Sequence, residues 1–198
     1  MTDKNVSIMN IGSMGYLPQV FKKIENEKKL NIVYLGGSIT MGCNATKTEL
    51  RYVDRSAKWW QTNFPDAEIS YFNAGIGATT SQFGVARVQE HVLDKQPDLV
   101  FVEFSVNDSS SPLFMETYES LVRRLLKAES VKAVVLINNL FYNTGTNAQG
   151  IHNAIGLHYD LPIVSVRNYI FPEIQLGNVC LADYTADMLH PTDLGHKM

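Results

Sequence analysis

The sequence has no long apolar runs and no clusters of basic residues. No apolar run approaches the roughly 18–20 residues that a membrane span needs, and the first 16 residues hold no continuous apolar segment of the signal-peptide type. Basic residues occur at most in pairs, and the net charge is −3. We therefore expect neither nucleic acid nor a membrane as a partner. Localisation stays open between the cytoplasm and secretion after removal of a signal peptide.

Cysteine is also scarce. Cys43 and Cys180 are the two cysteines of the chain. They allow one disulfide, and two free buried thiols fit at least as well. Neither a CxxC motif nor a Cys/His spacing indicates a structural zinc site.

What is present is a regular alternation of apolar runs and segments with helical spacing. The chain has 198 residues, enough for one domain with a sizeable core. Short runs typical of strands that are buried on both faces occupy 30–35, 68–74, 98–104, 132–138 and 161–166. Helical spacing is found at 17–28, 50–64, 81–95, 115–129 and 147–159. This order predicts an α/β fold, a three-layer α/β/α sandwich around a five-stranded parallel sheet.

The ends of the sequence suggest a domain within a longer protein. We predict that residues 17–198 form the domain and that residues 1–16 are an N-terminal extension or the remnant of a preceding module. A closing helix would be expected after HPTDLGH, where the sequence stops. We therefore expect a domain with a truncated C-terminal helix, taken from a longer multidomain chain.

Small polar residues and glycines gather directly after the predicted strands. The segments are GGSITMG (36–42), GIGATTS (75–81), SVNDSSS (105–111) and NNLFYNTG (138–145). In open α/β sheets, ligands bind beyond the carboxyl ends of the strands, near the point where the strand order reverses. The chemistry is therefore predicted at this edge of the sheet.

Three familiar glycine loops are excluded by single residues. A phosphate-binding loop would need lysine where Cys43 stands, and a dinucleotide fingerprint would need glycine in place of Thr80. The α/β-hydrolase elbow would need glycine in place of Thr40. Ser38 therefore needs another explanation than these motifs.

Acyl transfer by a serine requires a base, a group that orients the base, and donors to the oxyanion. Of the five histidines, His190 stands out because it lies in the polar segment ADMLHPTDLGH, where Pro191 disfavours a helical conformation. Asp187 precedes it by three residues. Asn107 offers an amide donor, and the GIGATT loop offers backbone N–H groups.

A metal site is the competing interpretation of the same segment. Asp187, His190, Asp193 and His196 recur at every third residue, and such side chains can hold zinc or iron. Pro191 and Gly195 argue against one uniform helix, and no distant ligand motif is visible.

Four segments together resemble the SGNH hydrolases, also called GDSL-like hydrolases. Ser38 matches the first block, with Gly37 in place of the familiar aspartate. GIGATTS resembles the second block, and Asn107 in SVND matches the third. Asp187 and His190 match the D-x-x-H of the fifth block, so the resemblance runs from about residue 30 to 196.

The resemblance implies a flavodoxin-like sheet and ester hydrolysis without a metal or other cofactor. Ser38 would be the nucleophile, His190 the general base and then acid, and Asp187 the residue that holds His190 in its useful tautomer. The oxyanion would be bound by Ser38 N–H, by the N–H of Gly77 or Ala78, and by the Asn107 amide.

The substrate is expected to be a small-molecule or carbohydrate ester. No long apolar lid segment is visible, and the loops with Tyr142, Asn143 and Tyr184 are short and polar. These features favour a short acyl group, acetyl above all, on a polar alcohol such as a carbohydrate. The alternatives are an acyltransferase, a lipase or thioesterase of the same fold, and a non-catalytic carbohydrate-binding domain, which would predict a broken triad.

Overall fold

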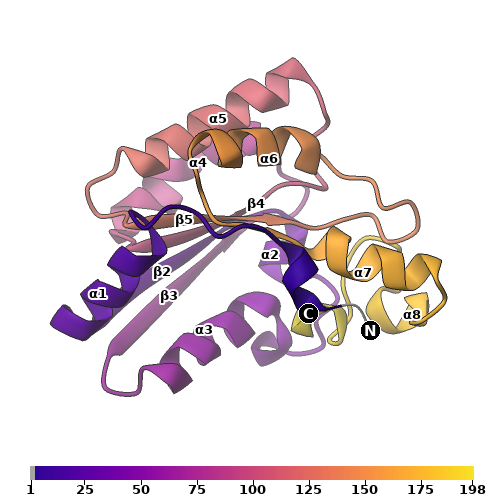
Figure 1. Cartoon of the computed structure of the whole chain (residues 1–198), viewed down its shortest axis with the longest axis horizontal. Coiled ribbons are helices and arrows are strands. Elements are labelled where there is room, and N and C mark those ends of the chain that lie inside the picture. Colours follow the sequence, from indigo (N-terminus) through magenta and orange to yellow (C-terminus); the bar gives the residue numbers. More distant parts are fainter. Residues whose placement is uncertain (1–2) are drawn as a thin grey trace.

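A six-stranded sheet forms the centre of the computed structural model, which describes residues 3–198 (Figure 1). Its order is β1-β6-β5-β4-β2-β3. The strands are β1 (Ile8–Asn10), β2 (Lys29–Gly36), β3 (Glu68–Gly75), β4 (Leu99–Glu103), β5 (Ala133–Asn138) and β6 (Ile163–Ser165). From β2 to β6 all pairs are parallel, and counting from β2 the order is 2-1-3-4-5. The predicted flavodoxin-like fold is therefore confirmed.

Helices cover both faces of the sheet. On one face lie α1 (Leu17–Glu27) and α3 (Tyr52–Asn63), and on the other lie α4 (Ser81–His91), α5 (Pro112–Leu126) and α6 (Gln149–His158) (Figure 1). Three more helices sit at the carboxyl edge: α2 (Ser38–Met41), α7 (Val166–Gln175) and α8 (Leu181–Tyr184). Among residues 3–198, none of the helices has the length and apolar character to cross a membrane.

The burial of β2 explains why its sequence reads as a continuous apolar run. Ile32 and Tyr34 pack with α1 and α3, whereas Val33 and Leu35 pack in the cluster with α4, α5 and α6. All four side chains are at most 1% exposed. A strand with helices on both faces needs apolar residues at every position, so the usual alternation is lost.

The strand count was predicted wrongly, because the sheet that the structure describes has six strands and not five. The additional strand, β1, pairs antiparallel with β6 and comes from the predicted extension 1–16. It has three residues and its side chains are partly exposed, so it gives no apolar run that could be recognised. Residues 1–2 lie outside the described part, and an origin of the extension in a preceding module stays a prediction.

Two helices also differ from expectation. The helix expected at 115–129 begins at Pro112, because the Ser111 hydroxyl accepts a hydrogen bond from Phe114 N–H and proline fits the first helical turn. Helix α7 was not predicted. It contains Pro172, which normally argues against a helix interior.

Candidate active site

Ser38 begins a one-turn helix at the point where the strand order reverses. β2 lies between β3 and β4, so the loops that leave these strands diverge around its carboxyl end. α2 starts two residues after β2 ends and stops at Gly42, whose φ of 102° is left-handed. This sharp turn holds Ser38 at the edge of the sheet with 7% of its surface exposed.

Gly37 lies close to the Asn107 side chain, which follows β4. A Cβ atom at Gly37 would lie 2.5 Å from Oδ1 of Asn107, so a larger residue here would require the Asn107 side chain to shift. The serine turn and the Asn107 turn therefore lie side by side.

His190 links Ser38 to Asp187 through two short hydrogen bonds. His190 Nε2 lies 2.8 Å from Ser38 Oγ, and His190 Nδ1 lies 2.7 Å from Asp187 Oδ2. Because Nδ1 faces a carboxylate, which can only accept, Nδ1 carries the proton and Nε2 is free to accept from the serine hydroxyl. The structure thus brings together the three side chains that the sequence singled out.

Asp187 is held by several donors of its own segment. Its Oδ1 accepts from the N–H groups of His190 at 2.7 Å and Leu189 at 3.0 Å. Partial desolvation acts to raise the pKa of Asp187, but the hydrogen bonds from His190 and Leu189 outweigh it and hold this pKa well below its usual value. The carboxylate is therefore ionised and oriented toward the imidazole over the whole physiological pH range.

The second glycine loop approaches the serine from the end of β3. A Cβ atom at Gly77 would lie 3.9 Å from Ser38 Cβ. Its neighbour Ala78 has φ 57°, a left-handed conformation that favours glycine. Asn107 follows β4 in a turn closed by Asn107 N–H to Phe104 O at 3.0 Å. The predicted donors Gly77, Ala78 and Asn107 thus lie in the loops that flank Ser38.

Comparison with known protein families identifies the family of this chain. The GDSL-like Lipase/Acylhydrolase family matches residues 34–198. The chain belongs to this family. A comparison with curated proteins finds no match.

Among solved structures, the chain resembles a two-domain esterase (CEX) active on acetylated mannans, co-crystallized with mannopentaose. The identity is 46% and the TM-score 0.97, over 100% of this chain and 54% of that one. The chain therefore spans about half the length of this two-domain esterase.

Two more distant structures support the fold alone. A catalytic mutant of Axe2, an acetylxylan esterase from Geobacillus stearothermophilus, is 20% identical with a TM-score of 0.71, over 85% of this chain and 89% of that one. LAE5, an alpha/beta hydrolase enzyme from the metagenome of Lake Arreo, Spain, is 20% identical with a TM-score of 0.70, over 85% and 90%.

Sequence reasoning missed a buried pair behind the Asn107 turn of this GDSL-like domain. Asp108 Oδ2 lies 3.1 Å from His152 Nε2, and Asp108 Oδ1 accepts from Ser81 N–H at 2.9 Å. The His152 ring stacks on Tyr118 with centroids 3.6 Å apart. Burial lowers the pKa of His152, although Asp108 acts in the opposite direction. The pair thus ties the Asn107 turn to α4 and α6.

The sequence signal for this pair was His152 itself, which shares a helix face with the buried Ile155.

A buried acid lies under the serine helix. Glu103, the last residue of β4, is 0% exposed, and Thr40 Oγ1 donates to its Oε2 at 3.4 Å. Burial raises the pKa of Glu103 from 4.5 to about 7. Glu103 is therefore largely protonated in slightly acidic solution and ionised only as the pH rises above neutral.

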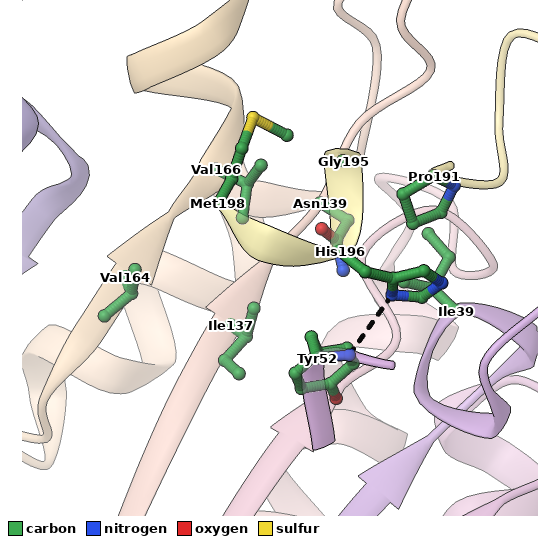
Figure 2. Close-up of a pocket in the computed structure, with 10 residues that line it drawn as sticks. All are labelled: Ile39, Tyr52, Ile137, Asn139, Val164, Val166, Pro191, Gly195, His196 and Met198. Carbon is green, nitrogen blue, oxygen red and sulfur yellow. Dashed lines mark hydrogen bonds between the residues drawn. The ribbon is translucent and has the colours of Figure 1, made fainter. Parts of the chain in front are cut away.

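An apolar cavity is lined by the residues drawn in Figure 2, and its volume is about 170 Å³. Ile39 and Pro191, which follow Ser38 and His190 in the chain, belong to its lining, whereas Ser38 and His190 themselves do not. The cavity therefore borders on the chain neighbours of the serine–histidine pair.

Tyr142, Asn143 and Tyr184, which come from the loops predicted near the site, differ in their exposure to solvent. Tyr142 is 2% exposed and packs in a cluster with Leu140 and Ile170, so its ring belongs to the interior. Asn143 is exposed and Tyr184 is half-buried. The polar character of this edge therefore comes from other residues than Tyr142.

The competing metal interpretation finds no geometric support. Within residues 3–198, no three His, Cys, Asp or Glu side chains lie together as a metal site would require. Asp193 accepts hydrogen bonds from Thr46, and His196 donates to Cys43 O. Cys43 and Cys180, both in the described part, are free thiols.

Proposed function

We propose that this chain is a serine esterase that removes short acyl groups, acetyl above all, from carbohydrates. The observation that carries the proposal is the hydrogen-bonded chain from Ser38 Oγ through His190 to Asp187, with distances of 2.8 and 2.7 Å. A non-catalytic carbohydrate-binding domain would not need this chain of three groups. Membership of the GDSL-like family supports the same assignment.

In the proposed reaction, Ser38 Oγ attacks the carbonyl carbon of the ester while His190 Nε2 takes the serine proton. Asp187 stabilises the imidazolium that forms. The negative charge on the carbonyl oxygen is met by Ser38 N–H, by the N–H of Gly77 or Ala78, and by the Asn107 amide.

Collapse of this intermediate releases the sugar hydroxyl, which receives its proton from His190, and leaves the acyl group on Ser38. Water then attacks the acyl-enzyme with His190 again as the base. Acetate leaves and Ser38 regains its proton. No metal or cofactor is required for any of these steps.

The alcohol is proposed from the similarity to the two-domain esterase active on acetylated mannans. At 46% identity over the whole of this chain, the residues around the serine are expected to accept a related polysaccharide. We therefore propose acetylated mannan as the substrate. That the chain is one domain of a longer multidomain protein stays a prediction.

Initial rates on p-nitrophenyl acetate and octanoate test the acyl specificity, and acetate release from acetylated mannan and acetylated xylan tests the alcohol. We expect at least about tenfold higher kcat/KM for acetyl over octanoyl, since each methylene that a small acyl site cannot accommodate should cost about 1 kcal/mol or more. Mannan should release acetate faster than xylan, and Ser38→Ala should abolish both rates. Faster turnover of octanoate would overturn the short-acyl assignment.

A further inference from the structure

The loop directly after the serine helix is fastened to the segment that carries His190. We propose that hydrogen bonds between loop 43–46 and segment 187–196, together called the loop latch, position His190 over Ser38, with Thr46 and Asp193 as the central positioning pair. The catalytic consequence rests on the proposed function. The structural basis of the latch is independent of it.

Thr46 and Asp193 form a two-point contact. Thr46 N–H donates to Asp193 Oδ1 at 2.8 Å, and Thr46 Oγ1 donates to Asp193 Oδ2 at 2.6 Å. One residue thus satisfies both oxygens of one carboxylate, and these bonds lower the pKa of Asp193. Charge-assisted bonds to two oxygens fix orientation as well as distance.

His196 adds a buried contact on one side. Its Nε2 donates to Cys43 O at 3.1 Å, and its Nδ1 accepts from Tyr52 N–H at 3.4 Å, the bond drawn in Figure 2. Accepting at Nδ1 requires a neutral ring, and burial lowers the pKa of His196 accordingly. On the other side, Asn44 Nδ2 donates to Asp187 Oδ2 at 3.3 Å.

Both partners of the latch are continuous with reacting groups. Gly42 N–H and Cys43 N–H each donate to Ser38 O at 3.0 Å, so loop 43–46 continues directly from the serine turn. Segment 187–196 belongs to no strand of the sheet, and the bridge between Thr185 and Pro191 holds its base. A displacement of about 1 Å in such a constellation can reduce the rate about 10²-fold, so contacts that hold this segment matter.

The latch also explains the repeated D-x-x-H spacing. Asp187 and His190 form the first copy, which faces Ser38. Asp193 and His196 form the second copy, and both of its side chains bond to loop 43–46. The first copy therefore binds Ser38, and the second copy binds loop 43–46.

The test uses Asp193→Ala and Thr46→Val, with Thr46→Ser as the conservative variant. Asp66→Ala and Thr62→Val, at exposed positions, are matched controls. Because the latch sets the position of His190 and not substrate binding, we expect kcat and the rate of fluorophosphonate labelling of Ser38 to fall about tenfold in Asp193→Ala, with KM within about twofold. Thr46→Val keeps the backbone N–H bond to Asp193 Oδ1, so its loss should be smaller, about threefold. Thr46→Ser keeps both donors and should retain the wild-type rates within about twofold.

Amide hydrogen exchange supplies a readout that needs no substrate. The amides of Leu189 and His190, which donate to Asp187, should exchange about tenfold faster in Asp193→Ala than in the controls, and about threefold faster in Thr46→Val. The double variant should be no slower in labelling than Asp193→Ala alone, because Asp193→Ala already removes both bonds to Thr46.

Unchanged labelling in Asp193→Ala, or faster exchange without slower labelling, would overturn the latch as a positioning device. Wild-type protein that resists labelling would instead refute the proposed function. In that case the exchange rates alone decide whether the latch orders segment 187–196: faster exchange would support the ordering, and unchanged exchange would refute it.

Discussion

Two hydrogen-bonded aspartate–histidine pairs in the described part of the chain have opposite surroundings. In the pair Asp187–His190, the side chains are 45% and 23% exposed, and the imidazole reaches Ser38. In the pair Asp108–His152, both side chains are 0% exposed and the imidazole stacks on Tyr118. The chemical groups are the same, so their surroundings decide what each pair can do.

The exposed pair meets the conditions for proton transfer. A base must have a nucleophile on one nitrogen, an orienting group on the other, and access for substrate. In the pair Asp108–His152, only the orienting carboxylate is present. His152 Nδ1 is buried and has no hydrogen-bond partner among the described residues, so no nucleophile and no substrate can reach it. This pair instead fixes the turn that carries Asn107.

The largest effect is expected from making the same substitution in both pairs. Asp187→Asn should lower kcat by about 10⁴, because the amide no longer selects the Nδ1–H tautomer of His190, while stability changes little at this exposed position. Asp108→Asn should lower the free energy of unfolding by about 1–3 kcal/mol, because a buried imidazole loses its acceptor. Kinetics and urea unfolding of both variants give the comparison.

In folded protein, Asp108→Asn should keep kcat within about tenfold of wild type. A loss of activity in Asp108→Asn as large as that in Asp187→Asn would contradict the division of roles between the pairs.

Asn107 precedes Asp108 of the buried pair, and its side-chain amide is one of the proposed oxyanion donors. Asn107→Ala removes a proposed oxyanion donor, so turnover should fall about 10²–10³-fold while KM changes little. Steady-state kinetics on p-nitrophenyl acetate measure the effect. A loss below about threefold would mean that the amide does not contact the oxyanion.

Glu103 sharpens the contrast between buried and exposed acids. Its folded-state pKa of about 7 exceeds the ordinary 4.5, so the stability that it contributes is fully present below pH 4.5 and is lost as the pH rises through 7. Glu103→Gln should remove this loss. From pH 4.5 to pH 8, the free energy of unfolding of wild type should therefore fall by on the order of 2 kcal/mol more than that of the variant, as measured by urea unfolding at both pH values. An equal pH dependence in both proteins would show that Glu103 does not titrate in this range.

The smallest effect is expected at Ala78. Its φ of 57° is costly for a residue with a side chain, so Ala78→Gly should raise the free energy of unfolding by up to about 1 kcal/mol. The backbone N–H remains, and kcat should therefore stay within about twofold of wild type. A large fall in kcat would mean that the alanine methyl group itself supports the site.

The sequence predicts the parts of the molecule that are governed by local pattern. The apolar run 30–35 corresponds to β2 (Lys29–Gly36), because a strand buried on both faces leaves an unmistakable composition. Ser38, Asn107, Asp187 and His190 were singled out because each stands in a short motif next to a strand end or a proline, and the structure brings Ser38, His190 and Asp187 within hydrogen-bond distance. Parts that depend on distant contacts were not found. β1 exists through its pairing with β6, and Asp108 meets His152 across 44 residues of sequence.

The central claim is that Ser38 is a nucleophile activated by His190. Mass spectrometry of the protein after reaction with a fluorophosphonate tests it most directly. We expect one adduct on the peptide that contains Ser38, labelled at least about 10³ times more slowly in His190→Ala and at the wild-type rate in the control Asp66→Ala. An esterase-active protein without an adduct on Ser38, or with equal labelling in His190→Ala, would contradict the mechanism.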